Sequence, residues 1–319
     1  MTTRRNTIFG LAGIIAAAMV GTAMPAAAAD FPSKAITLIV PFAPGGYTDT
    51  VARVIGKAIE DNKLLPEPLV IVNIGGGSGA PAYAKMMSSP KDGYTIMLWQ
   101  YNALISKALG VGNFDLNDIV SLGYTGTTSP VWAVGPKSGL KSFKDIVQKL
   151  KAKPKSLVEV GGIGTIAQFA GATLEQAAGI QTRFVNGASG ADRQRMLLGG
   201  NADISLFSPS EVIGNKDITP VASFGKKRSN KLPDVPTVAE LGYPQAEWSN
   251  ALWWMAPKGV PQKNIDILAT ALEKAVKTPE VEKFFTDNGD DPTWTPGPEA
   301  TAQAKTRLKA IEAVAAKLK

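Results

Sequence analysis

Loops rich in glycine and hydroxyl side chains are the part of this sequence best suited to binding chemistry. Each loop follows a short apolar segment and leads into a segment of helical pattern. The four loops are residues 43–49, 75–79, 161–165 and 186–190. Such loops direct several backbone N–H groups at one point, and the dipole of the following helix adds positive potential there. They can therefore bind an anion without a charged side chain.

Each loop also has a purely structural interpretation. Gly45 and Gly46 could form a tight turn, with Thr48 or Asp49 capping the next helix. Residues 75–79 match neither a complete phosphate-binding loop nor a dinucleotide fingerprint, because no Gly-Lys-Ser/Thr follows. The sequence nevertheless carries two sets of loops, one in each half of the chain. That arrangement favours a ligand held between the halves.

Histidine and cysteine are both absent from the 319 residues. Ser-His-Asp and Cys-His catalytic sites are therefore impossible, as are zinc, copper or haem sites that use these ligands. Acid–base chemistry would fall to Asp, Glu, Lys or Tyr. Asp290 and Asp291 stand beside Pro292 in a predicted loop. The composition favours a binding protein with no cofactor or metal, and an exported hydrolase that uses Ser, Lys or Asp is the alternative from another class.

Three aromatic residues, Tyr47, Trp99 and Phe207, fall at or just after predicted strand ends, where a binding cleft would lie. Core packing is the more frequent role for aromatic residues in such places. Arg193 follows the loop of residues 186–190 on its predicted helix. It could pair with a carboxylate, but exposure to solvent is the favoured interpretation.

The elements that position these residues alternate between strand and helix. Apolar segments 35–42, 69–72 and 94–98 predict strands, and helical patterns follow the first two; this alternation is typical of a parallel α/β sheet. Residues 131–134 predict a further strand. The second half repeats the pattern, with predicted strands at residues 157–160, 181–185, 202–207 and 219–224. In open sheets of this kind, ligands lie beyond the carboxyl ends of the strands.

The fold class that follows is α/β with two lobes, each a mainly parallel sheet flanked by helices. Lobe 1 takes residues 30–134, lobe 2 residues 135–224, and residues 225–319 return to lobe 1. Residues 247–256 predict the returning strand, and helices are expected at residues 265–276, 279–288 and 298–318. No long low-complexity linker is present, so strands join the lobes.

The first 29 residues have the pattern of a cleaved export signal. Arg4 and Arg5 precede a short apolar run at residues 8–20, and residues 26–29 are four alanines. The run is too short to span a bilayer. We therefore expect a periplasmic protein cleaved near Ala29, exported by either the Sec or the twin-arginine route. Cleavage lowers the formal charge by two, from +7 to +5, which is too little to indicate nucleic-acid binding.

Several motifs resemble those of the tripartite tricarboxylate transporter receptors, the Bug (TctC-like) solute-binding proteins. The first loop reads PFAPGGYTD at residues 41–49, and LPDVPTVAELG follows at residues 232–242. Shorter matches occur between and after them, at residues 92–95, 198–203 and 256–261. The matches run in order over nearly the whole chain beyond the export signal.

The resemblance implies a Venus-flytrap receptor, and not an enzyme, that captures a small organic carboxylate and delivers it to integral-membrane transporter subunits. It implies a monomer; a receptor that feeds a sensor kinase is the alternative within binding. The carboxylate would be held by the first loop and by the loop of residues 75–80. By position, the ligand-binding residues are Gly46, Tyr47, Thr48, Asp49, Ser78, Gly79, Ala80, Trp99, Gln100, Thr165, Gln168, Asn186, Phe207 and Ser208.

Several positions depart from the family pattern. Ala80 lies near a position that is usually polar, often Asn, and Trp99 and Gln100 stand where small residues are common. Gln168 replaces a usual His, Asn186 begins a pair that is usually Pro-Tyr, and Phe207 replaces a usual Asp. These changes make the far end of the expected pocket less acidic and more aromatic. They favour a dicarboxylate or a carboxylate with an aromatic or apolar body.

Overall fold

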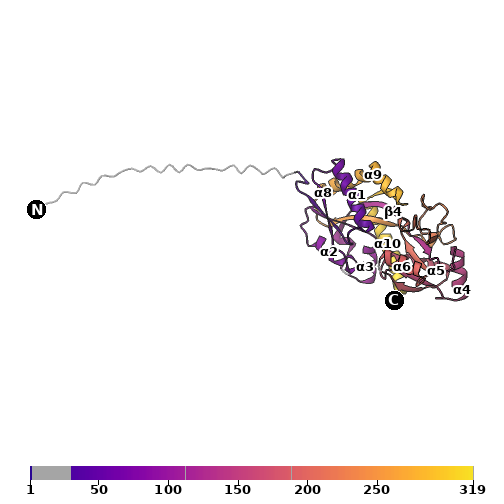
Figure 1. The fold of residues 1–319 in the computed structure, drawn as a ribbon. Helices are drawn as coiled ribbons and strands as arrows, with labels where there is room; N and C mark the ends of the chain where they lie inside the picture. Colours follow the sequence, from indigo (N-terminus) through magenta and orange to yellow (C-terminus); the bar gives the residue numbers. More distant parts are fainter. Residues whose placement is uncertain (2–29, 112, 188, 319) are drawn as a thin grey trace. The chain divides into compact units, whose positions relative to one another are not determined.

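Two β-sheets flanked by helices make up the unit Phe31–Lys319 (Figure 1). The computed structural model describes residues 1, 30–111, 113–187 and 189–318. The first sheet has the order β11-β4-β10-β3-β1-β2 and the second β7-β6-β8-β5-β9. The predicted two-lobed α/β fold is confirmed. The predicted export signal lies outside the described residues, apart from Met1.

The chain crosses between the sheets twice: it forms four strands of the first sheet, then all five of the second, and then the last two of the first. Those of the first sheet are β1 (Ile36–Val40), β2 (Leu69–Asn73), β3 (Thr95–Trp99), β4 (Ile119–Thr128), β10 (Asn250–Pro257) and β11 (Asp291–Pro296). Those of the second are β5 (Val131–Val134), β6 (Val158–Gly161), β7 (Arg183–Asn186), β8 (Ile204–Phe207) and β9 (Thr219–Ser223).

Helices follow most of the strands. They are α1 (Tyr47–Asp61), α2 (Ala80–Met87), α3 (Asn102–Leu109), α4 (Phe143–Ala152), α5 (Ile166–Ala178), α6 (Gly190–Gly199), α7 (Pro209–Val212), α8 (Gln262–Val276), α9 (Pro279–Asp287) and α10 (Gly297–Leu318). Short 3₁₀ turns occur at Gly77–Gly79, Leu116–Asp118 and Pro244–Ala246. No helix among the described residues combines the length and the apolar character that crossing a membrane requires.

The strand pairing corrects two predictions. The sheets are mixed rather than mainly parallel, because β10 runs antiparallel to both β3 and β4, and β5 runs antiparallel to both β8 and β9. The sequence placed Val131–Val134 at the end of lobe 1, but this strand is hydrogen-bonded within the second sheet. The first crossing therefore lies at Ser129 and Pro130, before β5.

The hydrophobic core of the first sheet has two sides. On one side, alternate residues of β1 pack with apolar residues of α1 and α8, as in the buried set Ile36, Leu38, Val51, Ile55 and Leu268. A strand presents successive side chains to opposite faces. Trp253 and Trp254 of β10 accordingly fall in different clusters, both fully buried.

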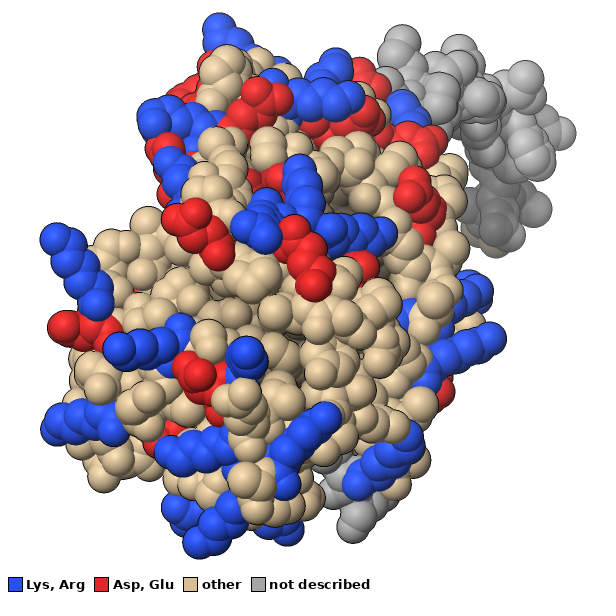
Figure 2. Space-filling model, turned by 90° about the vertical axis from the view of Figure 1, so that its right-hand side faces the viewer, with Lys and Arg blue, Asp and Glu red and all other residues tan. Residues whose placement is uncertain are grey.

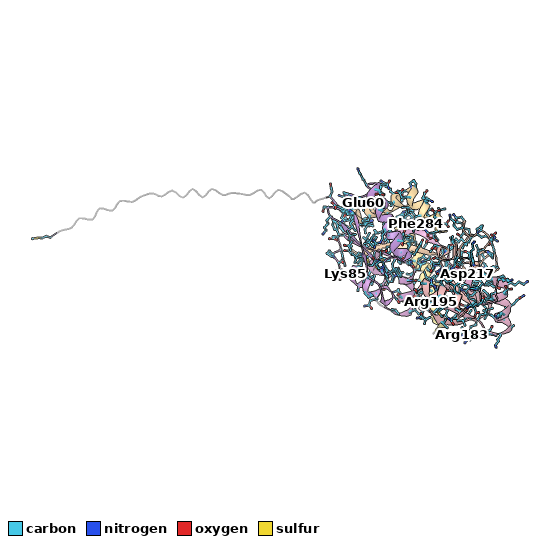
Figure 3. All side chains as sticks on the ribbon, in the orientation of Figure 1. Glu60, Lys85, Arg183, Arg195, Asp217 and Phe284 are labelled. Atoms are coloured by element: carbon cyan, nitrogen blue, oxygen red, sulfur yellow. The ribbon has the colours of Figure 1, made fainter. Side chains whose placement is uncertain are left out.

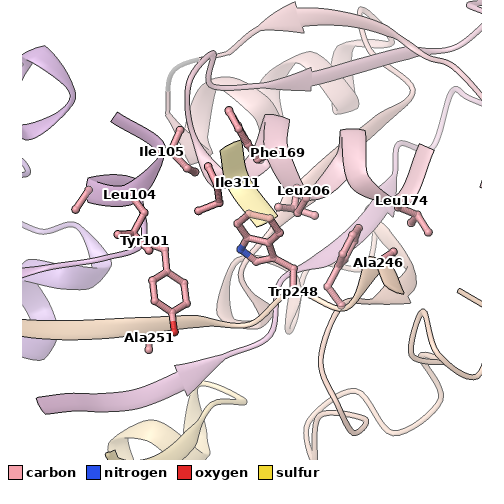
Figure 4. Close-up of a cluster of buried hydrophobic side chains, with 14 of the residues drawn as sticks. Tyr101, Leu104, Ile105, Phe169, Leu174, Leu206, Ala246, Trp248, Ala251 and Ile311 are labelled. Atoms are coloured by element: carbon pink, nitrogen blue, oxygen red, sulfur yellow. The ribbon is translucent and has the colours of Figure 1, made fainter. Parts of the chain in front are cut away.

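The other side of the first sheet shares its core with the second sheet. Buried side chains from both sheets belong to one cluster, which α10 enters through a stripe at helical spacing: Ala300, Ala304, Leu308, Ile311 and Ala315. Figure 4 shows Tyr101, Trp248 and Ile311 close together in this cluster with Phe169 and Leu206. The two lobes therefore have a continuous core as well as two chain crossings.

The surface carries charges of both signs. On the face seen in Figure 2, basic and acidic side chains are interspersed over much of the area, with basic ones more frequent toward the lower edge. This distribution agrees with a modest net positive charge and with no strongly basic stripe on that face.

Candidate anion-binding site

A cavity of about 520 Å³ lies between the two sheets. Its volume falls within the usual range for small-molecule sites, roughly 300–1,000 Å³. It is lined by Phe42, Ala43, Pro44, Gly46, Tyr47, Thr48, Gln100, Asn102, Thr128, Pro130, Thr165, Ile166, Ala167, Ser189, Gly190, Arg193, Leu206, Phe207, Ser208, Glu211 and Asn250. A hollow of about 710 Å³ lies elsewhere, between α4, α5 and α10. Of these two hollows, the 520 Å³ cavity is the one lined by glycine-rich loops: residues from three of the four loops line it, and the loop of residues 75–79 contributes none.

Besides the four-residue helix α7, four longer helices of the described chain begin at this cavity. α1 and α3 come from the first sheet, α5 and α6 from the second, and the first residues of each helix line the wall. The first turn of a helix has backbone N–H groups without intrahelical partners, and the helix dipole places partial positive charge there. Four such ends facing one space from two sides create a field that favours an anion.

Thr48 is held in a defined orientation by a chain of amides. Gln100 donates through Nε2 to Thr48 Oγ1 at 2.6 Å, and Asn250 donates through Nδ2 to Gln100 Oε1 at 3.2 Å. Asn250 in turn accepts from the backbone N–H of Tyr101 at 3.4 Å. Because Thr48 Oγ1 accepts from Gln100, its own proton remains for an acceptor in the cavity. The group is thus set to donate to an oxyanion.

Asp49 lies outside the cavity lining and stabilises the first loop through hydrogen bonds. Its carboxylate accepts from the backbone N–H of Gly45 at 2.8 Å, from Arg53 Nη2 at 3.0 Å and from Asn73 Nδ2 at 3.0 Å. The side chain is 2% exposed. Burial opposes ionisation, but the hydrogen bonds from Arg53, Gly45 and Asn73 outweigh it and lower the pKa of Asp49. The loop shape therefore depends on this carboxylate.

Tyr47 lines the cavity and donates its hydroxyl to Asp290 Oδ2, at the entry to β11. Burial, together with the nearby Asp290, raises the pKa of Tyr47 well above its usual value, so the phenol stays neutral. Burial also raises the pKa of Asp290 to about 6. The sequence placed Asp290 and Asp291 in a loop. Asp290 does lie just before the strand, but it is buried, whereas Asp291 is the first residue of β11, which pairs with β4.

The second-sheet wall holds the charged side chains of the described lining, Arg193 and Glu211. Arg193 Nη2 donates to Glu211 Oε1 at 3.1 Å, and its guanidinium lies 5.4 Å from the centre of the Phe207 ring. Glu211 Oε2 accepts from the backbone N–H of Ser208 at 2.8 Å and from its hydroxyl at 2.9 Å. The wall thus offers one positive and one negative group beside an aromatic ring.

The structure brings half of the sequence-predicted residues to the cavity. Those that line it are Gly46, Tyr47, Thr48, Gln100, Thr165, Phe207 and Ser208. Those that do not are Asp49, Ser78, Gly79, Ala80, Trp99, Gln168 and Asn186. Trp99 is 1% exposed and packs edge-on against Phe114, with ring centres 5.6 Å apart. It belongs to the core because its position on β3 directs it to the same buried side as Met97.

Several of the predicted residues that do not line the cavity instead fix the conformation of the loops next to it. Gln168 Oε1 accepts from the backbone N–H of Gly164 at 2.9 Å, and Asn186 Oδ1 accepts from that of Ile163 at 3.3 Å. Both therefore fix the loop that precedes α5. Gly79 has φ +87°, and a Cβ there would lie 2.3 Å from the Trp99 ring. Position 79 therefore requires glycine, because any side chain there would clash with the Trp99 ring.

Sequence reasoning missed the lining residues on β4, β10 and α7, above all Thr128, Asn250 and Glu211. Asn250 begins a strand whose other residues are apolar, and a polar residue at that point was a usable signal. Arg193 was assigned to solvent. Its side chain is only 14% exposed, because it lies between Phe207 and Glu211 at the wall.

Comparison with known proteins places these features in a family. A model of the tripartite tricarboxylate transporter family receptor matches residues 51–316. The chain belongs to that family. BugT of Bordetella pertussis is 30% identical over 283 residues, which cover 86% of this chain and 86% of BugT. The family consists of solute-binding receptors.

Two solved structures from Rhodopseudomonas palustris share the fold of this family member. One, with adipate, has a TM-score of 0.79 at 22% identity and covers 90% of this chain and 99% of its own. The other, with bound malate, has a TM-score of 0.77 at 21% identity and covers 89% of this chain and all of its own. Their similarity extends over both sheets.

Proposed function

We propose that this chain is a periplasmic receptor that captures a small organic carboxylate in the cavity between its sheets and passes it to an integral-membrane transporter. The observation that carries the proposal is the meeting of four helix N-termini at one cavity, with the Thr48 hydroxyl prepared to donate. Family membership and the adipate and malate complexes support the same class of ligand. Tyr47, Phe207 and the apolar lining suit a ligand with an apolar body.

The proposal includes a binding role without catalysis, cofactor or metal, in a monomer. The donors that we expect to hold the anion are backbone N–H groups, the Thr48 hydroxyl and the Arg193 guanidinium, which bind an anion but do not activate a nucleophile. Two lining serines donate their hydroxyls to carboxylates, Ser208 to Glu211 at 2.9 Å and Ser189 to Asp192 at 2.7 Å. Both pairs cap the start of a helix, which gives them a structural role. Export follows from the predicted signal at residues 1–29.

A ligand screen tests the proposal. Binding to the native state alone raises stability by RT ln(1 + [L]/Kd), about 2.7 kcal/mol at a hundredfold excess over Kd. We expect mono- and dicarboxylates of three to eight carbons to give the largest thermal shifts, with sugars, amines and inorganic phosphate giving none. Chromatography of the recovered ligand checks for turnover. A shift produced only by uncharged or cationic compounds, or conversion of a bound ester, would overturn the proposal.

A further inference from the structure

Arg193 has a buried donor that the folded chain leaves without a partner. Its Nη2 is bonded to Glu211, but its Nε is buried and has no hydrogen-bond partner. A buried donor without a partner costs roughly 1–3 kcal/mol, so each one in a native protein calls for a physical reason. Here the guanidinium lies on the wall of the cavity, at the side opposite to the Thr48 loop.

Three contacts hold the guanidinium in place. The Phe207 ring lies 5.4 Å from it, and Glu211 fixes one of its nitrogens at 3.1 Å. The stem runs along the turn before α6, since a Cβ on Gly187 would lie 3.3 Å from Arg193 Cγ. A guanidinium held in this way loses little freedom when it binds, and its planar fork suits a carboxylate.

The Glu211 carboxylate, by contrast, has its strong acceptor positions in use. Oε2 accepts twice from Ser208, and Oε1 accepts from Arg193. The same wall therefore has donor capacity to spare and little acceptor capacity. This imbalance favours a negative group on the ligand over a positive one.

We infer that Arg193 is a specificity-determining residue that binds a second anionic group at the far end of the ligand. The inference rests on the proposed function: the first carboxylate lies at the Thr48 loop and the second reaches Arg193. The receptor then selects dicarboxylates over monocarboxylates of equal length. Arg193 binds the second charge, and the Phe207 ring, 5.4 Å away, supports the guanidinium.

Calorimetry with matched probes tests this role. Straight-chain α,ω-dicarboxylates of three to eight carbons are compared with the monocarboxylates of the same length, on wild-type protein and on Arg193→Met. We expect wild type to prefer the best dicarboxylate by about 10- to 100-fold, and Arg193→Met to lose that preference while monocarboxylate affinity stays within about threefold. Arg193→Lys, which keeps the charge without the fork, should recover part of the preference.

A control on the same helix separates position from charge. Arg195 also lies on α6 but is 76% exposed and pairs with Asp192; Figure 3 labels it. Arg195→Met removes one positive charge without touching the cavity lining. It should leave both affinities unchanged. An equal loss of preference in Arg195→Met would assign the effect to the general field of the protein and overturn the inference.

A double variant removes the remaining ambiguity. Arg193→Met alone leaves Glu211 unpaired at the cavity, where its negative charge would itself repel a dianion. Arg193→Met with Glu211→Gln removes both charges and keeps the cap of α7, since Gln replaces Glu in a capping box. We expect the dicarboxylate preference to stay lost. Its return in the double variant, or a wild-type protein that binds monocarboxylates equally well, would overturn the inference while leaving the proposed function intact; binding of neither class would overturn both.

Discussion

The Tyr47 hydroxyl donates to the carboxylate of Asp290, which joins the first turn of α1 to the entry of β11 across 243 residues of sequence. Tyr47 lines the cavity and Asp290 lies behind it, nearly buried. The second oxygen of Asp290 is buried without a hydrogen-bond partner. The position of a cavity wall therefore depends on a carboxyl group that titrates in an accessible pH range.

Asp290→Asn should change the pH dependence of stability. The pKa of Asp290 is raised from 3.8 to about 6, mainly by burial, so the folded protein holds the proton more tightly than the unfolded chain. The resulting stabilisation is complete below pH 3.8 and is lost as the pH rises through about 6. The free energy of unfolding of wild type minus that of Asp290→Asn should fall by about 3 kcal/mol across this window. Urea titrations at several pH values measure it, and a constant difference would contradict the assignment.

Thr48→Val should weaken ligand binding without a large loss of stability. The variant removes the hydroxyl that accepts from Gln100 and that we expect to donate to the ligand carboxylate. A hydrogen bond to a charged group is worth about 1.5–3 kcal/mol, so Kd should rise about 10- to 100-fold. Thr50→Val is the matched control, because the Thr50 hydroxyl bonds to the Gly46 carbonyl and lies outside the cavity lining. Equal effects of the two variants in calorimetry would remove Thr48 from the site.

Trp99→Ala should affect stability alone, whereas Phe207→Ala should also affect ligand binding. Trp99 packs on Gly79 and Phe114 inside the core, and its truncation should destabilise the protein by roughly 3–5 kcal/mol. Phe207 lines the cavity beneath Arg193, so its truncation should also weaken dicarboxylate binding in the protein that remains folded. Denaturation and calorimetry on both variants separate the two effects. A Trp99→Ala protein of normal stability with impaired binding would restore Trp99 to the site.

Glu159→Gln should make the protein more stable at neutral and alkaline pH relative to wild type. Glu159 is fully enclosed in the second sheet, where it accepts from Trp132 Nε1 at 2.9 Å and Thr182 Oγ1 at 3.2 Å. Burial and the neighbouring Glu175 raise its pKa well above the usual value. The stabilisation from its bound proton is present at low pH and is lost as the pH rises through the raised pKa. Gln keeps the acceptor for Trp132 and does not titrate. The melting temperature of the variant minus that of wild type should therefore increase as the pH rises.

The parts of the fold that the sequence predicted are those with strong local patterns. The run of residues 35–42 is β-branched and apolar, and the glycine loop and helix after it appear as predicted. β4 and β11 were missed because their residues carry no such pattern: β4 contains two glycines and four threonines or serines, and β11 begins Asp-Pro. Both are stabilised by pairing with each other, which is a property of the tertiary structure.

The candidate site was predictable where it consists of backbone. The loop with Gly46 and Thr48 lies at the cavity because strand ends and helix starts set its position. The direction of a side chain from a strand end was not predictable, as Trp99 shows, since it depends on which face of β3 meets the core. The pairing of Arg193 with Glu211 joins two helices that are adjacent only after β8 is in place.

The threading of β10 determines the order in which the protein can assemble. This strand lies between β3 and β4 and is the sole strand that joins them within the described sheet, yet it begins at Asn250. The second sheet, in contrast, uses one uninterrupted stretch from Val131 to Ser223. During synthesis, that sheet has all its strands while the first is still in two pieces. One edge of β3 therefore stays unpaired until β10, in the last quarter of the chain, has been synthesised.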